Sequence, residues 1–290
     1  MFHDPGHSMR RLLMLCALLV CSFAVSAGNG PGAVRKQIES ALYVTGTIDI
    51  TPTGDVVAHA LDQPEKLPKG IVDMAARLLP QWKFESVVLH DKAISRSKMS
   101  LLFVGRKLDD GNYSIELRSA TFSGGNPDES VRLAPKGRRL PNYPIGLVDA
   151  GISGTVFLIV KIDRDGKVIN VDVSHVNLRV IGNESQMDQW RRALAKSSIA
   201  AARKWTFVPP ISGPEANKPY WFGTLPFEYF IEGHEPPAYG KWQTYVAGPR
   251  AVLPWLDETL MAEGNTDALT SNTFHPAGSG RRLLTPLSGS

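Results

Sequence analysis

One order of motifs occurs twice in this chain of 290 residues, and it constrains the fold more than any other feature. In each copy a glycine opens a run of alternating apolar residues, which continues through a glycine-containing turn, a helical pattern and a W-x-F motif. Gly46, the turn at Gly54 and "QWKF" in the first copy match Gly154, the turn at Gly166 and "KWTF" in the second. The offset of about 120 residues is too long for a stacked repeat and predicts two related domains.

The turn of the second copy lies within "IVKIDRDGKVINVDV", residues 159–173. β-Branched residues flank Asp165-Gly166, and an Asp-Gly pair between such runs predicts a β-hairpin with positive φ at both central residues. A calcium loop of the EF-hand type is the alternative. It would place Lys161 at the first ligand position and the short Asp172 at the twelfth, so the pattern favours the hairpin.

Helical spacing is expected in three segments. A short helix is predicted over residues 33–44, "AVRKQIESALYV", and a second over residues 67–80, between Pro68 and Pro80. The third is predicted to begin with Ser185 as its N-cap and to continue to Trp205. Five aromatic side chains are predicted to fill the cores: Trp82, Phe84, Trp190, Trp205 and Phe207.

These patterns predict an α+β fold with two related small domains, each an antiparallel sheet packed on helices. The first domain is expected at residues 31–125, and the second at 139–232, after a polar linker at residues 126–138. Residues 233–290 are rich in Gly, Pro, Ser and Thr, which predicts a flexible C-terminal tail.

Residues 1–27 have the pattern of a secretory signal peptide. Two arginines precede an apolar run of about fourteen residues, and a small residue, Ala27, marks the expected cleavage site. An uncleaved anchor formed by residues 12–27 is the alternative, although a spanning helix needs about 20 apolar residues. Both cysteines, Cys16 and Cys21, lie in this segment, so we expect a secreted chain without a disulfide.

The sequence lacks the patterns of an enzyme or a cofactor-binding protein. The five histidines after the leader share no metal-ligand spacing, and no nucleophile elbow or phosphate-binding glycine loop occurs. The formal net charge of +4 is too small to indicate a nucleic-acid partner. We therefore expect no catalytic residue, no metal, no cofactor and no nucleic acid.

The segment "TLPFEYFI", residues 224–231, is apolar and aromatic but contains Pro226. Because proline cannot donate a ladder hydrogen bond, this strand is expected at the edge of a sheet. An exposed edge can accept a partner strand. The alternative is that the segment after Glu232 folds back and covers this edge.

Residues 139–232 resemble the carboxy-terminal domain of TonB, the energy transducer of outer-membrane transport. The resemblance rests on "LPNYPIGLVDAGISGTVFLIVKIDRDGKVINVDVSHV", the helix that follows, "KWTFVPP" and "LPFEYF". Residues from about 40 to 125 look like a degenerate copy of the same domain.

This resemblance implies a non-enzymatic periplasmic protein that binds a partner by strand addition, such as the periplasmic end of an outer-membrane transporter. The partner is expected along residues 222–231 and near the Tyr-Pro pair. The residues implied in partner binding are Tyr143, Pro144, Phe222, Leu225, Phe227, Tyr229 and Phe230. A homodimer in which two chains pair through their edge strands is a further alternative. A TonB-type energy transducer anchored in the inner membrane is the alternative, but the leader lacks the family's functional His and no long Pro-rich spacer follows it.

Overall fold

The computed structural model describes residues 34–35, 37–86, 93–108, 110–124, 127–231, 238–256, 269, 271–277 and 281–287. The predicted signal peptide therefore lies outside the described residues. None of the helices in the described ranges is long and apolar enough to span a membrane.

Strands dominate the described part of the chain, together with two α-helices and four short 3₁₀ helices. The helices are α3 (Lys69–Leu78), α4 (Glu184–Ala202), η1 (Pro64–Lys66), η2 (Leu79–Gln81), η3 (Pro127–Glu129) and η4 (Ile145–Leu147). The strands are β1 (Ile38–Ile50), β2 (Val56–Leu61), β3 (Ser95–Lys107), β4 (Tyr113–Ser123), β5 (Arg132–Leu133), β6 (Gly154–Asp163), β7 (Val168–Leu178), β8 (Phe207–Val208), β9 (Tyr220–Tyr229), β10 (Gln243–Val246) and β11 (His275–Pro276).

Nine of these strands form one antiparallel sheet with the order β11-β9-β6-β7-β10-β1-β3-β4, and β2 pairs with β1. Strands β1–β4 with α3 form the N-terminal half, and β6–β9 with α4 form the C-terminal half. The short strand β10 connects them, because it pairs with Ile38–Ala41 of β1 and, at Val246, with Leu178 of β7. Strands β5 and β8 form a separate two-stranded sheet.

The two halves repeat the same local construction. The order β2-β1-β3-β4 in the first half corresponds to β7-β6-β9-β11 in the second. In each half the turn glycine accepts a hydrogen bond from the W-x-F motif: Gly54 from the Phe84 amide and Gly166 from the Phe207 amide, both at 2.8 Å. The hairpin turn and the aromatic motif therefore contact each other in both copies.

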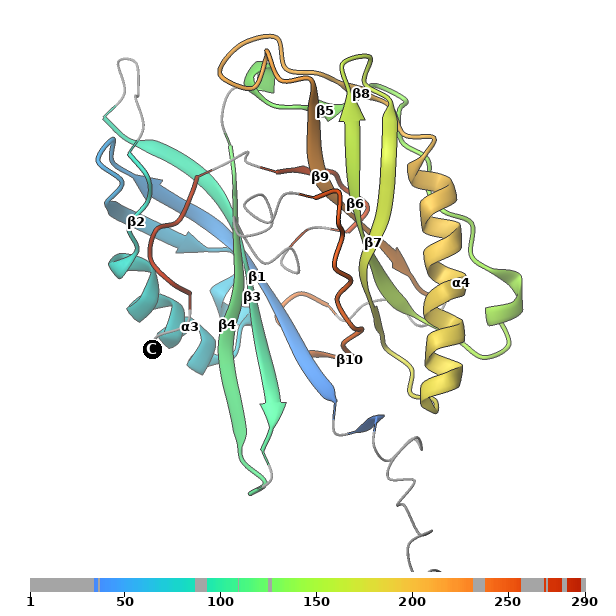
Figure 1. Ribbon diagram of the computed structural model, residues 1–290. Coiled ribbons are helices and arrows are strands. Elements are labelled where there is room, and N and C mark those ends of the chain that lie inside the picture. Colours follow the sequence, from blue (N-terminus) through green and yellow to red (C-terminus); the bar gives the residue numbers. More distant parts are fainter. Residues whose placement is uncertain are drawn as a thin grey trace, which may run out of the picture.

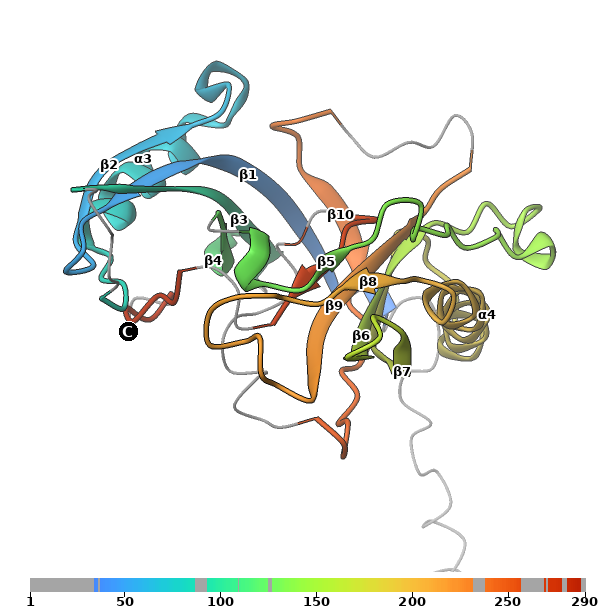
Figure 2. The same cartoon turned by 90° about the horizontal axis from the view of Figure 1, so that it is seen from above.

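Each half has its own main hydrophobic cluster. Helix α3 contributes to the N-terminal cluster and helix α4 to the C-terminal cluster. Figures 1 and 2 show α3 and α4 at opposite outer sides of the molecule, with the strands between them. Trp82 and Phe84 are buried in the N-terminal cluster, and Trp205 and Phe207 in the C-terminal cluster. Trp190 is partly buried against the second cluster, so the prediction that these five rings are core residues is confirmed.

Two local predictions about helices are wrong. Residues 38–44, predicted as the end of a helix, belong to strand β1, because Leu42, Val44, Ile48 and Ile50 recur with a period of two and are all buried on one face. Helix α4 is capped by Asn183 and not by Ser185. The Asn183 side chain accepts from the Gln186 amide at 2.9 Å, and the Gln186 side chain accepts from the Asn183 amide at 3.0 Å.

The β6–β7 hairpin is confirmed, but its turn differs from the predicted type. Gly166 has φ of 75°, whereas neither Arg164 nor Asp165 has positive φ, so the connection is a longer loop with one left-handed glycine. The Asp163 carboxylate accepts from the amides of Asp165 and Lys167 at 3.0 and 2.8 Å. This carboxylate therefore holds the turn, and no metal-binding group of acidic, His or Cys side chains occurs among the described residues.

The expectation of a flexible tail is wrong for the described residues beyond position 238. Residues 243–246 and 275–276 are strands of the main sheet. Residues 281–287 lie along the N-terminal half, where the Leu284 amide donates to the Lys83 carbonyl at 2.8 Å and Leu283 packs against the core. The linker predicted at 126–138 also contains structure, since β5 pairs with β8.

Candidate functional site

Strand β9 has different neighbours on its two sides. On the inner side it pairs with β6 along its whole length, from Tyr220 to Tyr229. On the outer side, the Asn272 amide donates to the Pro226 carbonyl at 2.7 Å, and the Ala277 amide donates to the Phe222 carbonyl at 2.9 Å. Residues of the tail thus cover β9 from Phe222 to Pro226, as the alternative drawn from the sequence anticipated.

The outer side of β9 has no described strand beside it beyond Pro226. Backbone amides of successive strand residues point to opposite sides, so that of Glu228 points outward, like the carbonyl of Pro226, and we expect the same of Phe230, the first residue after β9. The amides of Phe227 and Tyr229 point toward β6. We call residues 228–230 the open edge.

The side chains predicted to bind a partner differ strongly in exposure. Phe230 on the open edge is 42% exposed. Tyr143 and Pro144 are half-buried. The other four are buried, namely Phe222, Leu225, Phe227 and Tyr229. Their assignment to partner binding stays a prediction, and in this arrangement Leu225, Phe227 and Tyr229 contribute to the hydrophobic core.

The structure brings two of these residues together at the end of β9. The rings of Tyr143 and Tyr229 lie 6.1 Å apart in an edge-to-face arrangement. The Tyr143 hydroxyl donates to the Ile152 carbonyl at 2.6 Å, and the Tyr229 hydroxyl shares a hydrogen bond of 2.8 Å with Ser198 of α4. Burial raises the pKa of the Tyr229 hydroxyl, which keeps it neutral. These contacts attach the Tyr-Pro segment to the open edge.

The open edge is also held by an ion pair, between Arg179 and Glu228, that no sequence pattern predicts. Arg179, which follows β7, contacts the Glu228 carboxylate, and both side chains are mostly buried. Arg179 also donates to the Thr155 hydroxyl at 3.2 Å and to the Tyr229 carbonyl at 3.4 Å. No sequence pattern links positions 179 and 228, because only the pairing of β6 with both β7 and β9 brings them together.

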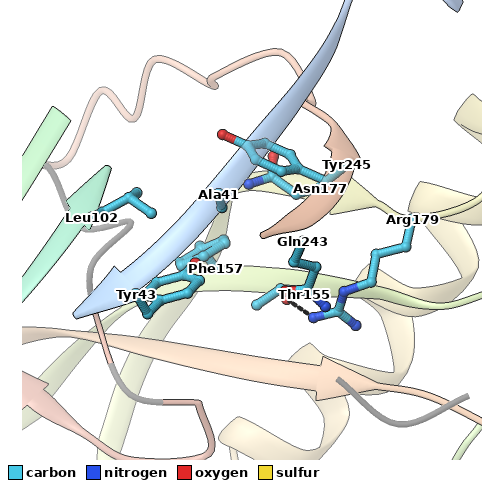
Figure 3. A pocket seen from close by; sticks show the side chains of 9 residues that line it. All are labelled: Ala41, Tyr43, Leu102, Thr155, Phe157, Asn177, Arg179, Gln243 and Tyr245. Carbon is cyan, nitrogen blue, oxygen red and sulfur yellow. Dashed lines mark hydrogen bonds between the residues drawn. The ribbon is translucent and has the colours of Figure 1, made fainter. Parts of the chain in front are cut away.

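Arg179 lies at a small pocket between the two halves, shown in Figure 3. Residues from β1, β3, β6, β7 and β10 line this pocket together with Arg179: Ala41, Tyr43, Leu102, Thr155, Phe157, Asn177, Gln243 and Tyr245. The pocket carries no arrangement of nucleophile, base or metal ligands among these residues. We take the strand edge as the candidate binding site.

Comparison with known proteins supports a TonB-like region. The chain is similar to the protein named TonB of Xanthomonas campestris pv. campestris, in strains B100 and ATCC 33913, with 35% identity over 88 residues in each case. The matched region is 30% of this chain and 34% of the relative, so the chain spans about a third of the length of these relatives. No protein-family model and no solved structure matches the chain.

Proposed function

We propose that this chain is a non-enzymatic, TonB-like periplasmic protein that binds a partner strand along the outer side of β9, in connection with outer-membrane transport. The observation that carries the proposal is that the chain's own tail already adds to this edge through backbone hydrogen bonds to Phe222 and Pro226. An edge that accepts one strand offers the same donors and acceptors to another. The similarity to TonB over 88 residues supports the transport context.

The open edge is the place where a partner strand begins to pair. Its outward amides at Glu228 and Phe230 offer backbone donors, and Phe230 offers an exposed aromatic surface. The buried side chains of Leu225, Phe227 and Tyr229 keep the strand rigid, which lowers the entropic cost of pairing. Tyr143 lies beside this end of β9, and with the adjoining Pro144 it forms one wall of the proposed site.

Proline scanning tests strand addition. Phe230→Pro removes an outward amide, so we expect loss of partner capture with a native circular dichroism spectrum. Phe230→Ala is the matched control, because it keeps the amide, and we expect it to weaken capture only moderately. Tyr229→Pro should instead damage the sheet, since its amide points toward β6. Position 230 is preferred to position 228 for the proline substitution, because a change at Glu228 also breaks the ion pair with Arg179.

Capture is measured by crosslinking the full chain to solubilised outer-membrane proteins and quantifying the products by mass spectrometry. Equal capture by the wild type and Phe230→Pro would show that strand addition at the open edge is wrong. The tail or the N-terminal half would then be the better place to search.

A membrane-anchored TonB-type energy transducer is the second candidate function. The feature that favours it is the apolar leader. If residues 12–27 remain as an anchor, the chain is held in the inner membrane with its folded part in the periplasm. Mass spectrometry of the purified protein distinguishes the two. A terminus at Gly28 supports the periplasmic binding protein, whereas an intact leader in the inner-membrane fraction supports the transducer.

A further inference from the structure

Residues 271–277, here called the tail strand, occupy the outer side of β9 mainly through backbone contacts. The Asn272 and Ala277 amides donate to the Pro226 and Phe222 carbonyls at 2.7 and 2.9 Å. Between these two contacts, β11 pairs with residues 223–224 of β9. Backbone contacts of this kind do not depend on side chains, so another extended segment can replace them.

The tail strand also makes a contact that depends on a side chain, that of Phe274. Phe274 is buried, and its ring centroid lies 4.6 Å from that of Phe207 in the core of the C-terminal half. The ring rests directly on Gly223, where an added Cβ would lie 2.2 Å from it. The missing side chain at position 223 therefore creates a socket for the Phe274 ring, which we define by Gly223 and Phe207.

The tail strand is poorly suited to be a permanent strand of the sheet. Its regular pairing comprises only two residues, whereas β9 has ten. Pro276 has no amide hydrogen, and because the amide of Ala277 points toward β9, the nitrogen of Pro276 points away from it. The tail strand thus ends the sheet, and the burial of Phe274 supplies a large part of its attachment.

We propose that the tail strand is an internal stand-in for the partner, and that the partner is an extended peptide with a large apolar side chain that fills the Gly223 socket when the tail strand leaves. This inference rests on the proposed function and adds to it the chemistry of the partner and a means of regulation. The tail strand competes with the partner at high effective concentration, because the tail strand and β9 belong to one chain. Only molecules whose tail strand has left the edge bind the partner, which lowers the apparent affinity.

The test uses the full chain and a fluorescent peptide with the sequence of residues 269–280, LTSNTFHPAGSG. Phe274→Ala empties the socket, so we expect the Kd of this peptide to fall at least tenfold relative to the wild type, as measured by fluorescence anisotropy. Asn272→Pro is a second variant that keeps the Phe274 side chain. Because Asn272 has φ of 57°, which proline cannot adopt, it should release the tail strand and lower the Kd in the same way.

Three controls test the socket itself. A peptide with Ala in place of its Phe should bind the Phe274→Ala variant at least tenfold more weakly than the original peptide does. Adding Gly223→Ala to that variant fills the socket and should abolish binding of the original peptide. Leu283→Ala loosens the chain only where it packs on the N-terminal half, so its affinity should equal that of the wild type.

The inference is overturned if neither Phe274→Ala nor Asn272→Pro improves peptide binding, or if the Ala peptide binds as well as the original. It is also overturned if Leu283→Ala has the same effect as Phe274→Ala. Such results leave the proposed function standing as long as Phe230→Pro still abolishes partner capture. Conversely, improved peptide binding with unchanged capture by Phe230→Pro supports the socket and contradicts partner binding at the open edge.

Discussion

Replacing Gly166 by alanine tests the contact on which both copies of the repeat depend. Gly166 has φ of 75°, and a Cβ at this position would lie 2.0 Å from the Phe207 carbonyl oxygen. Since real Cβ atoms do not approach backbone oxygen so closely, the W-x-F segment must move away from the turn. The hydrogen bond of 2.8 Å from the Phe207 amide to the Gly166 carbonyl would then be lost.

The expected cost has two parts. A residue with a Cβ in the left-handed region costs roughly 1–2 kcal/mol. Loss of the backbone hydrogen bond adds about 0.5–1.5 kcal/mol. We therefore expect Gly166→Ala to lower the free energy of unfolding by about 1.5–3.5 kcal/mol, with any strain in the Phe207 packing adding to this.

Gly151→Ala is the matched control, because Gly151 has φ of 62° but an added Cβ there meets no atom within 4 Å. It isolates the conformational cost, which we expect to be about 1–2 kcal/mol. Gly54→Ala repeats the main experiment in the first copy, where a Cβ would lie 1.9 Å from the Phe84 carbonyl oxygen.

The assay is urea unfolding followed by circular dichroism, with the free energy extrapolated to water. Equal free energies for Gly166→Ala and Gly151→Ala would refute the close approach of the turn to the W-x-F motif. A large loss for Gly166→Ala with none beyond the control for Gly54→Ala would show that only the second copy keeps this contact.

Further predictions concern the core, an ion-pair cluster and the hairpin turn. Trp205→Ala and Trp82→Ala should each cost about 3–5 kcal/mol in urea unfolding, because both rings are buried, and near-native stability would contradict their place in the core. Burial alone would raise the pKa of Glu39, but hydrogen bonds from Arg118, Tyr245 and Arg106 hold it below its ordinary value. A lowered pKa stabilises the fold above the unfolded-state pKa and loses this effect as the pH falls through the folded-state pKa. The stability difference between wild type and Glu39→Gln should therefore shrink below about pH 4, and a difference independent of pH would contradict it. Calcium or a chelator should leave the Tm unchanged, because the Asp163 carboxylate already accepts two backbone amides, and a rise of several degrees with calcium would show a site there.

Local patterns in the sequence predicted those elements whose stabilising contacts lie close along the chain. The hairpin before Val168 and the helix after Pro68 follow from turn residues and periodicity within about 20 residues. The aromatic core positions were also predictable, since Trp and Phe two residues apart point to one face of an extended segment. The segment at 38–44 was mistaken for a helix, because its apolar spacing fits both periods over so short a stretch.

The candidate site was predicted only in part. Pro226 predicts that β9 lies at an edge; among the described residues β9 is the second strand from that end of the sheet, with β11 of the tail strand beside it. No sequence pattern assigns Phe274 to that edge or pairs Arg179 with Glu228. A glycine inside a strand, at position 223, is a general signal for close approach of another segment, but it does not name the segment.

The hairpin turns at Gly54 and Gly166, the helices α3 and α4 and the two W-x-F motifs follow from side-chain periodicity and turn chemistry over short stretches of sequence. How these units share one sheet depends on contacts between distant parts of the chain. Strand β10 is four residues long and lacks a strong strand pattern, yet it pairs with β1, about 200 residues earlier, because both of its sides find unpaired backbone groups. The same requirement places the tail strand on β9. Backbone hydrogen bonding is the same for every sequence, so which distant segment completes an edge depends on the packing of the whole chain.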